Sequence, residues 1–545
     1  MKRRDFIKLS ATASAIGLLP IELKAMLPNL DLSDCDFTHR RLILINLSGG
    51  NDGLNTIVPL NQYTEYANLR PDIKIPETGL NQYIQLDTTL PSNQSIGLNP
   101  GLTGFKSMYD SGKMRVIQSV GYPSQNKSHF ASNDLYMTGN DGNSWGNGNN
   151  SGWIGRFMEK HYEDLLSEDY PLAIQIGSAK SSLGFHGLVE HGMSLNLTGQ
   201  DASGFYSVLS GFSGQTINSF PNSDYGEELS YIMDTDLLAN QYSANISNAF
   251  NTGNNTITYP NTDIGNQFKT VAKLISGGLE SKIYMVKLGG FDTHNNLVEP
   301  GEDINGRHYT LMKKLDEAVS AFFSDLESQD LDDNVVGVTY SEFGRKAKQN
   351  GNHGTDHGEI APMFLFGKAI NPGVSGTNPD LSEAIDDNNY QIETVQFDYR
   401  ETFATILQQF LGGKDETIDD AFYNHTSNSS FINAMQNDFI KDTYKVPEDC
   451  LTEDTTVSIP EVEQVKQFQL YPNPCVRFLN IIPIYDFDQP FEVKIFSVTG
   501  QLIFSRVYQS EDELTSIPVD QWRTGHYHVQ IRSERHKETH KIIKM

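Results

Sequence analysis

The chain has 545 residues and a mass of 60.9 kDa, which exceeds the size of one ordinary hydrophobic core and predicts two or more domains. Hydrophobic residues make up 38% of the sequence, enough to form a sizeable core. The 41 Lys and Arg residues against 69 Asp and Glu residues give a net charge of −28, which argues against nucleic acid and anionic membrane surfaces as partners.

A short basic and apolar segment opens the chain. The adjacent residues Arg3 and Arg4 precede a mildly hydrophobic run, Leu9–Leu19, that is rich in Ala and Ser. The run is too short for a transmembrane helix, and its basic flank is typical of an export signal over residues 1–25. The paired arginines resemble the twin-arginine (Tat) signal, which implies export of a folded protein by the Tat translocon. The alternative is an ordinary basic amphipathic N-terminus. No other run approaches 18 apolar residues, so no transmembrane span is expected.

Two apolar runs in the first third of the chain predict buried strands. The first, Arg41–Leu47, ends in a Gly-rich turn that places Asp52 at the carboxyl end of the strand. The second, Met114–Val120, leads to Ser128 at the start of a helix-like segment. A Ser at a helix start is usually an N-cap, but it is also where a nucleophile or phosphate would meet the helix dipole.

The next stretch changes in composition. Pro171–Ile176 predicts another strand, and residues 180–262 are then rich in Ser, Asn, Gly and Thr. We interpret this region as insertions or a cap over the sheet. Within it, apolar residues from Leu229 to Phe250 keep the three-and-four spacing of a helix, which is more typical of a core face than of a cofactor site.

Strands and helices then alternate toward residue 411, which predicts a mostly parallel sheet flanked by helices, with right-handed crossovers. The predicted strands are Lys282–Leu288, Val335–Tyr340 and Met363–Phe366, and the predicted helices lie over 265–279, 311–326 and 399–411.

Polar residues cluster where these strands end or begin. Ligands of open α/β sheets bind at the carboxyl ends of strands, so this cluster predicts a metal or polyanion site. Several carboxylates brought together would repel one another without a cation. The alternatives are a solvated loop whose Gly and Asp residues serve turns, and an arginine that simply pairs with Glu342 three residues away. The candidate residues are Asp292, His294, Glu342, Arg345, Asp356 and His357.

The end of the chain has a different character. Residues 447–464 are acidic and bracketed by prolines, which predicts a linker. Residues 465–545 hold 10 Lys and Arg against 9 Asp and Glu, so the negative charge lies before them, which supports a boundary near residue 465. Short alternating runs separated by turns predict a small β-sandwich over 465–545.

None of the three cysteines, Cys35, Cys450 and Cys475, has the spacing of a structural zinc site. A disulfide between Cys35 and Cys450, formed in an oxidising compartment, would link the two ends of the large domain and leave Cys475 as a free thiol. Their spacing does not decide this.

Four motifs together resemble an uncharacterised bacterial family, the "domain of unknown function 1501" family, related to the alkaline phosphatase and sulfatase superfamily. They are LSGGNDGLN at 47–55, GFDTH at 290–294, SEFGR at 341–345 and GTDHG at 354–358. The resemblance covers roughly residues 40–440 and implies an alkaline phosphatase-like α/β domain over 40–446.

Three motifs of the tail resemble the sorting domain of type IX secretion substrates. They are YPNP at 471–474, VTG at 498–500 and GHY at 525–527. This implies that the type IX secretion machinery carries the protein from the periplasm across the outer membrane, to the cell surface or the extracellular space, in Bacteroidetes-type bacteria.

The superfamily resemblance also implies roles for single residues. Asp52 stands where the first-strand carboxylate binds a metal, and Ser128 stands near the nucleophile, with Ser132 as a second candidate. Asp292 and His294 are similar to ligands of the other metal, although the usual spacing between them is wider, and His357 matches the late His ligand.

One position departs from the superfamily. Active members usually place Asp-His where this chain has Glu342 and Phe343, and Phe343 cannot bind a metal. The site is then a one-metal site, an altered two-metal site, or inactive.

The leading interpretation is a hydrolase of phosphate or sulfate esters that uses a divalent metal, zinc first and calcium or manganese as alternatives, with Arg345 gripping an oxyanion of a small anionic ester. The alternative is an inactive surface protein that binds glycans or other envelope components.

Replacing both Arg3 and Arg4 by Lys should block export if the Tat translocon is the route, because the positive charge is kept while the paired arginines are lost. A general secretory signal would tolerate this change. Immunoblotting of cell fractions that shows normal export of the double variant would reject the twin-arginine interpretation.

Overall fold

The computed structural model describes residues 35–143, 151–166, 168–177, 183–187, 193–194, 242–299, 306–422, 430–451, 468–483, 490–497, 502–508, 515–523, 525–533 and 537–544. The predicted export signal lies outside these residues, as do most of the predicted linker and the first part of the helix expected from Leu229. Residues 242–252 are helical, which confirms the second part of that helix. Among the helices of the described part, none is long and apolar enough to cross a membrane.

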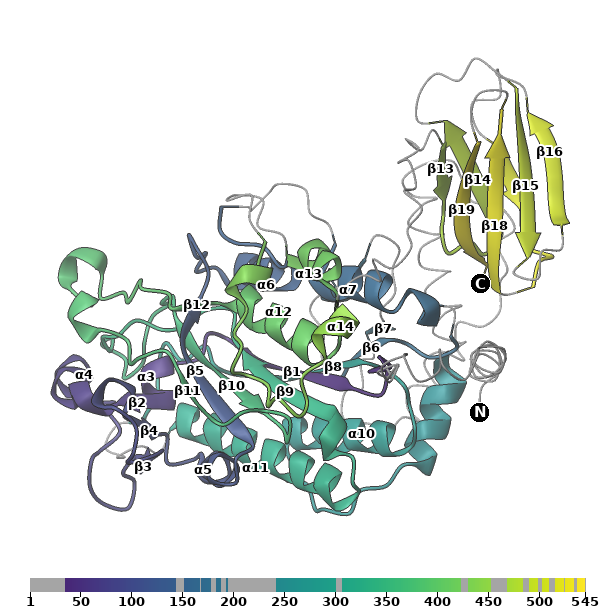
Figure 1. The fold of residues 1–545 in the computed structure, drawn as a ribbon. Helices are drawn as coiled ribbons and strands as arrows, with labels where there is room; N and C mark the ends of the chain where they lie inside the picture. The colour runs from purple at the N-terminus through teal and green to yellow at the C-terminus, as the bar shows by residue number, and fades with distance from the viewer. Residues whose placement is uncertain are drawn as a thin grey trace, which may run out of the picture. The chain divides into compact units, whose positions relative to one another are not determined.

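A nine-stranded sheet forms the centre of the α/β domain (Figure 1). Its strands are β1 (Arg41–Ser48), β5 (Met114–Gly121), β6 (Ala173–Gln175), β7 (Met193–Ser194), β8 (Ile283–Gly289), β9 (Val335–Tyr340), β10 (Ala361–Phe366), β11 (Gly373–Ser375) and β12 (Phe397–Asp398). The order is β11-β5-β10-β9-β1-β8-β6-β7, and β12 pairs with β5. All pairings are parallel except those of β10, which runs antiparallel to both β5 and β9.

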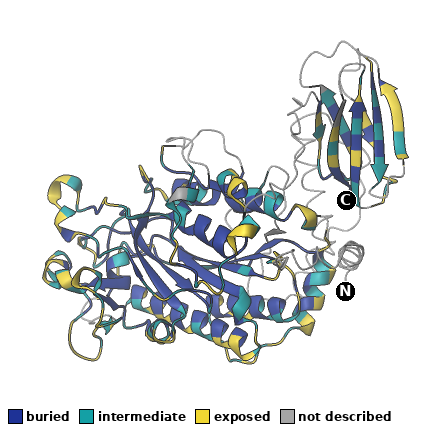
Figure 2. Cartoon of the chain, viewed as in Figure 1, coloured by how far each residue is buried: buried dark blue, intermediate teal, exposed yellow. Residues whose placement is uncertain are grey.

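The central strands are buried on both faces, as parallel strands covered by helices on both sides usually are (Figure 2). Every residue of β5, β9 and β10 is buried. Leu42, Ile43, Leu44 and Ile45 of β1 are fully inaccessible to solvent. Continuous apolar runs of this kind are therefore sufficient to place these strands in the core.

Two groups of helices cover opposite faces of the sheet (Figure 1). On one face, α11 (Arg307–Ser328) packs against both α5 (Thr103–Asp110) and α10 (Asp263–Ser276). The other face carries α6 (His129–Thr138), α7 (Trp153–His161), α12 (Tyr399–Gln409) and α13 (Asp415–Phe422). The mostly parallel sheet flanked by helices, predicted from the sequence, is confirmed.

The reversal of β10 decides which loops meet at one edge of the sheet. The carboxyl ends of β1, β5, β8 and β9 lie on the same edge because these strands are mutually parallel. Since β10 is antiparallel, its amino-terminal end lies there too. The loop before β10 therefore joins the loops that follow the other four strands.

Smaller elements line this edge. A three-stranded sheet is formed by β2 (Ile57–Pro59), β4 (Ile96–Leu98) and β3 (Ile84–Gln85), beside the short helices α3 (Gly53–Thr56) and α4 (Tyr63–Leu69). The sequence did not predict these elements, which are too short to show a clear hydrophobic period.

The C-terminal part is a β-sandwich of two antiparallel sheets, as predicted. The strands are β13 (Phe468–Tyr471), β14 (Phe478–Pro483), β15 (Phe491–Ser497), β16 (Leu502–Tyr508), β17 (Thr515–Pro518), β18 (Gly525–Arg532) and β19 (Lys537–Lys544). The sheet orders are β13-β14-β17 and β16-β15-β18-β19. Inward residues such as Leu479, Val493 and Val529 share one buried cluster. Cys475 is a buried free thiol, whereas Cys450 is disulfide-bonded.

The α/β domain should fold without the sandwich, because the sandwich has a hydrophobic cluster of its own. The short helix α14 (Glu448–Leu451) occupies the start of the predicted linker, so we would end the chain after Leu451 and keep Cys450. This truncated chain should be soluble and unfold cooperatively in calorimetry. In the native host it should lose surface attachment but still cross the inner membrane.

Two outcomes would contradict this prediction. Loss of cooperative unfolding would show that the two parts depend on a shared interface and would remove the predicted boundary. A truncated protein that is still attached to the cell surface would remove the sorting role of the tail.

Candidate metal centre

The loop after β1 approaches the loops after β8 and β9 closely enough to require glycine. Gly49 has a φ of +125°, and a Cβ at this position would lie 2.3 Å from the backbone nitrogen of Asp292. Gly50 has a φ of +81°, and its Cβ would lie 2.4 Å from the ring of Phe343. Any side chain at either position would therefore push these loops apart.

Arg345 holds the same loops together from the inside. Its guanidinium donates hydrogen bonds to four backbone carbonyls, those of Gly49, Gly50, Phe291 and Thr355. Nη2 also donates to Oδ1 of Asp292 at 2.7 Å. The Arg345 side chain is fully buried, with these donors engaged inside the protein. Arg345 therefore positions Asp292 and is not free to grip a substrate oxyanion, and its carboxylate partner is Asp292 rather than Glu342.

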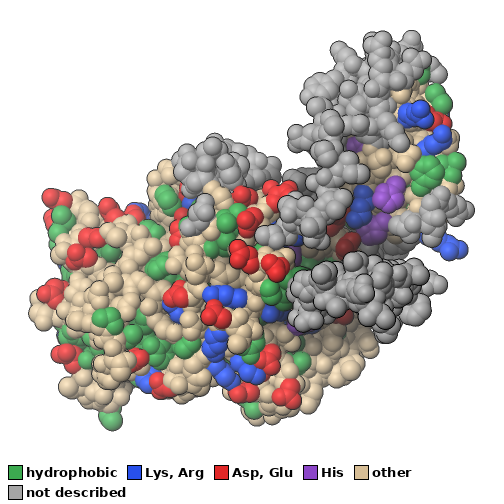
Figure 3. All heavy atoms as spheres, viewed as in Figure 1, with side chains coloured by type: hydrophobic (Ala, Val, Ile, Leu, Met, Phe, Trp, Pro, Cys, Tyr) green, Lys and Arg blue, Asp and Glu red, His purple; other side chains and the backbone are tan. Residues whose placement is uncertain are grey.

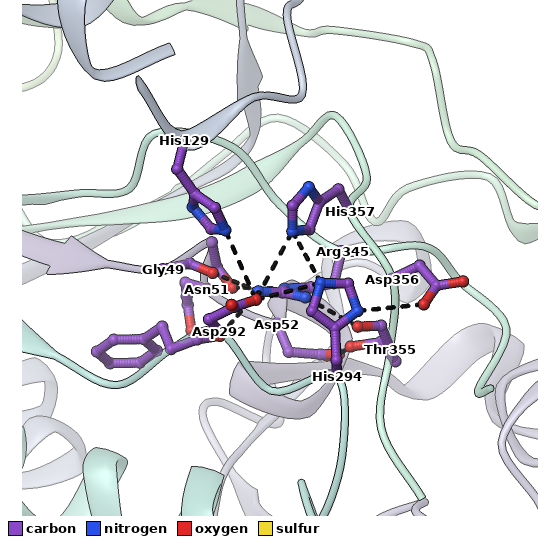
Figure 4. Close-up of polar contacts among 12 residues, drawn as sticks. Gly49, Asn51, Asp52, His129, Asp292, His294, Arg345, Thr355, Asp356 and His357 are labelled. Atoms are coloured by element: carbon purple, nitrogen blue, oxygen red, sulfur yellow. Dashed lines mark hydrogen bonds and ion pairs between the residues drawn. The ribbon is translucent and has the colours of Figure 1, made fainter. Parts of the chain in front are cut away.

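Three histidines from three loops face one another at this edge (Figure 4). His129 is the first residue of α6, His294 follows β8, and His357 precedes β10. In each ring Nδ1 faces an oxygen atom. The partners are Oε1 of Glu342 for His129 at 3.0 Å, Oδ1 of Asp356 for His294 at 3.2 Å, and the carbonyl of Lys127 for His357 at 2.8 Å.

A neutral imidazole that donates from Nδ1 leaves a lone pair on Nε2. All three Nε2 atoms lie close to Oδ1 of Asp292, at 3.6 Å for His129, 3.2 Å for His294 and 3.6 Å for His357. The Nε2 atoms of His294 and His357 are themselves only 2.9 Å apart. Lone pairs and a carboxylate oxygen repel one another at such distances unless a cation or a proton is shared between them.

These distances fit a bound metal ion. Ligand atoms about 2.05 Å from one tetrahedral zinc ion stand roughly 3.3 Å from each other. His129, Asp292 and His357 offer ligand atoms that all lie within 4.8 Å of one another. The donor set and its spacing therefore suit a divalent cation, and His294 adds a further imidazole beside it.

The protonation states also suit metal ligands. Burial alone would raise the pKa of Asp292, but the hydrogen bond and charge of Arg345 bring it below its usual value. Burial lowers the pKa of the His357 imidazole. At neutral pH the first group is anionic and the second neutral, which are the forms that bind metals.

The aromatic ring of Phe343 supports two of the histidines. Its centroid lies 4.8 Å from the ring of His129 and 4.5 Å from that of His357. Phe343 is buried and has no ligand atom. The residue that departs from the superfamily pattern thus forms an apolar wall that fixes the orientation of two imidazoles.

Glu342 and Asp356, both predicted as metal ligands, contact the Nδ1 atoms of two of the histidines. Oε1 of Glu342 accepts a hydrogen bond from the amide of Gly49 at 2.7 Å and faces Nδ1 of His129. Asp356 faces Nδ1 of His294 and lies 3.5 Å from the ammonium of Lys346. Carboxylates in this position orient a metal-binding histidine and increase its basicity. Oε1 of Glu342 and Oδ1 of Asp356 lie in such a position, while Oε2 of Glu342 is buried without a hydrogen-bond partner among the described residues.

Asp52 lies outside the histidine cluster, in a buried ion pair. Its carboxylate accepts hydrogen bonds from Nη1 of Arg70 at 2.6 Å, the amide of Asn55 at 2.9 Å and the hydroxyl of Thr355 at 2.8 Å. Burial alone would raise the pKa of Asp52, but Arg70 brings it below its usual value. Asp52 is also the N-cap of α3. We therefore leave Asp52 out of the ligand set.

The two serine candidates differ in access. Ser128 is exposed at the N-cap of α6, and its hydroxyl caps no helix amide. Ser132 is fully buried, and its hydroxyl donates to the carbonyl of Asn126. Ser128 thus remains available for chemistry and Ser132 does not.

His129 is the functional candidate that sequence reasoning missed. It follows Ser128 directly, at the start of the helix after β5. The available signal was that β5 ends at the same sheet edge as the other site-bearing strands, which brings the Ser128–His129 pair to the cluster.

Two family profiles match parts of the chain. Residues 279–413 match "Protein of unknown function (DUF1501)", and residues 469–545 match "Secretion system C-terminal sorting domain". Both resemblances are confirmed over these residues. The sorting domain directs the protein to the cell surface or the extracellular space. No curated protein matches the chain.

Similar solved structures include members of the expected superfamily. One, from Bacteroides thetaiotaomicron and connected with "metabolism of multiple glycosaminoglycans", is 11% identical over 89% of this chain and 93% of its own, with a TM-score of 0.35. A Vibrio parahaemolyticus protein "in the alkaline phosphatase superfamily" is 8% identical over 88% and 81%, with a TM-score of 0.28. An immunoglobulin-like β-sandwich from Bacteroides vulgatus is 11% identical over 14% and 84%, with a TM-score of 0.13.

Arg70→Met should lower the free energy of unfolding by about 3–5 kcal/mol, because it leaves the Asp52 carboxylate buried without its cation. Metal content per chain should not change, since neither residue belongs to the histidine cluster. Denaturant unfolding and elemental analysis of the same samples give both quantities.

The matched control is Lys313→Met, which breaks only the exposed pair with Glu317 and should change stability by no more than about 0.5 kcal/mol. If Arg70→Met kept full stability but lost metal, Asp52 would return to the ligand set.

Proposed function

We propose that this protein is an exported, metal-dependent hydrolase of phosphate or sulfate esters that acts at the cell surface. The observation that carries the proposal is the convergence of three Nε2 atoms on Oδ1 of Asp292. The site is open to solvent, because the side chains of Asp292 and His294 are 48% and 43% exposed. A small ester can therefore reach the groups that would act on it.

The donor set favours zinc over calcium. We assign His129, Asp292, His294 and His357 as ligands, which gives three imidazole nitrogens and one carboxylate oxygen. Calcium and magnesium prefer oxygen donors, whereas imidazole suits zinc. The same donor set would bind manganese less strongly than zinc. A bound divalent cation would act as a Lewis acid that neutralises the oxygens of the ester.

One cation is sufficient for this site. Arg345 already places a fixed positive charge 2.7 Å from Asp292, and Asp52 is paired with Arg70. Glu342 is committed to the amide of Gly49 and the ring of His129. These contacts support the one-metal alternative for the altered site, and Oε2 of Glu342 stays buried without a hydrogen-bond partner among the described residues.

Ser128 is the proposed nucleophile. Its hydroxyl oxygen would attack the phosphorus or sulfur atom and release its proton to solvent, while the ester oxygen leaves with the bonding electron pair. Water would then cleave the resulting seryl ester and regenerate the hydroxyl. Glu342, Asp356 and Phe343 would keep the three imidazoles in place during both steps.

A second candidate function rests on the completeness of the ligand set. Three histidines and one aspartate would fill a tetrahedral site if His294 joined His129, Asp292 and His357, and closed sites of this kind are typical of structural metals. The protein would then be a surface protein stabilised by its metal, which binds glycans or other envelope components without hydrolysing them.

Metal and activity measurements on the full chain test both candidates. Elemental analysis should find a divalent metal, and chelation should lower the melting temperature, because a ligand at 100 times its Kd stabilises the folded state by about 2.7 kcal/mol. His357→Ala should lose metal. Ser128→Ala should keep it but lose at least about 100-fold in turnover of aryl phosphate or aryl sulfate esters.

Matched controls exist for both variants. His353 has a φ of +54°, which Asn tolerates better than Ala, so His353→Asn is the control for loss of a nearby imidazole. Ser107→Ala removes an exposed hydroxyl on α5. Protein without metal, whose melting ignores chelator and added zinc, would remove the metal proposal. Metal without any ester hydrolysis would select the second candidate.

A further inference from the structure

A cavity of about 970 Å³ adjoins the loop that carries Asp292 and His294. It is lined by residues just before and just after this pair, among them Gly290 and Asn295, and by the first turns of α11. None of the four proposed metal ligands lines it, so the cavity is distinct from the metal centre. Its volume is that of pockets that hold small-molecule ligands.

Two positively charged side chains of α11 line this cavity, Arg307 and Lys314. They are seven residues apart, which places them on the same face of the helix two turns apart. Neither forms an ion pair with any residue in the described part of the chain. Among the described lining residues, one carboxylate, that of the exposed Glu299, stands against these two cations, so the described part of the lining carries more positive than negative charge.

This positive charge is unusual for its surroundings. The chain as a whole carries a net charge of −28, and acidic side chains are scattered over the face shown in Figure 3. The neighbouring residue Lys313 lies 3.9 Å from the carboxylate of Glu317. Within the described residues, Arg307 and Lys314 form no ion pair, whereas their neighbour on the same helix does.

The cavity lies within reach of a molecule held at the metal centre. Nη1 of Arg307 is 3.5 Å from the backbone carbonyl of Asp292, so the guanidinium contacts the backbone of a proposed metal ligand. Polar side chains that can donate hydrogen bonds, those of Asn295, Asn296 and Thr310, line the same space.

We propose that this cavity binds a second anionic group of the substrate, so that the substrate is a polyanionic ester with several sulfate or phosphate groups. The proposal rests on the proposed function, because one group must occupy the metal centre while another occupies the cavity. Two cations and several hydrogen-bond donors match an oxyanion with three or four acceptor oxygens. In a strongly acidic protein, a local positive charge is also what allows a polyanion to approach.

Isothermal titration of the full, metal-loaded chain with sucrose octasulfate tests the proposal, with sucrose and inorganic sulfate as reference ligands. Sucrose octasulfate should bind at least about tenfold more tightly than inorganic sulfate, and sucrose should not bind. The double variant Arg307→Met with Lys314→Met should weaken octasulfate binding by about tenfold or more, since hydrogen bonds to charged groups are lost. Lys313→Met should stay within about twofold of the unmodified protein.

The same titration on His357→Ala separates this inference from the proposed function. If the metal proposal fails but octasulfate binding still depends on Arg307 and Lys314, the cavity stands as an anion site. If the double variant binds octasulfate as tightly as the unmodified chain, or if Lys313→Met weakens binding to the same degree, the cavity assignment is overturned whether or not the protein hydrolyses esters.

Discussion

The buried guanidinium of Arg345 is the interaction on which the candidate metal centre depends. It joins the loops after β1, β8 and β9 through four backbone carbonyls and holds Asp292 with its remaining contact. These loops contain Gly49 and Gly50, which have little preference for one conformation of their own. The planar guanidinium, with five donors in fixed directions, holds these flexible loops in one conformation. Asp292 is thereby fixed at the point where the three imidazoles meet.

The direction of one strand is the second constraint. Because β10 runs antiparallel to its neighbours, the loop before it carries His357 to the same edge as His129 and His294. A parallel β10 would have put its preceding loop at the opposite edge of the sheet. The alternation of strands and helices predicts parallel order and gives no sign of the reversal, since β5 and β10 are distant in sequence and pair only in the folded sheet.

The sequence was informative where a residue's environment is set by its own strand. The strands β1, β5, β8 and β9 are short apolar runs and were predicted for that reason. The site residues Asp292, His294 and His357 were predicted because they stand beside strand ends. Sequence reasoning failed where the contact partner of a residue is distant in the sequence. A carboxylate after a strand has the same local pattern whether it faces a metal or, like Asp52, an arginine 18 residues away. Arg345 was expected to meet a nearby Glu or a substrate, but its carboxylate partner is 53 residues earlier. His129 was missed because the local pattern at this helix start indicated only Ser128, as an N-cap or as a nucleophile.

The pairing of carboxylates explains how so acidic a chain can present a site for anions. Asp52 is neutralised by Arg70, Asp292 by Arg345, and Asp356 lies beside Lys346. Among the described residues, Asp292 is thus the carboxylate whose oxygen meets the three Nε2 atoms, while the imidazoles supply the other donors. These pairings reduce the negative charge that would repel an ester, and a divalent cation would reduce it further. Arg307 and Lys314 of α11, which form no ion pair within the described part of the chain, place further positive charge beside the loop after β8. The charges that favour a metal at the cluster therefore also favour an anionic molecule longer than one ester group.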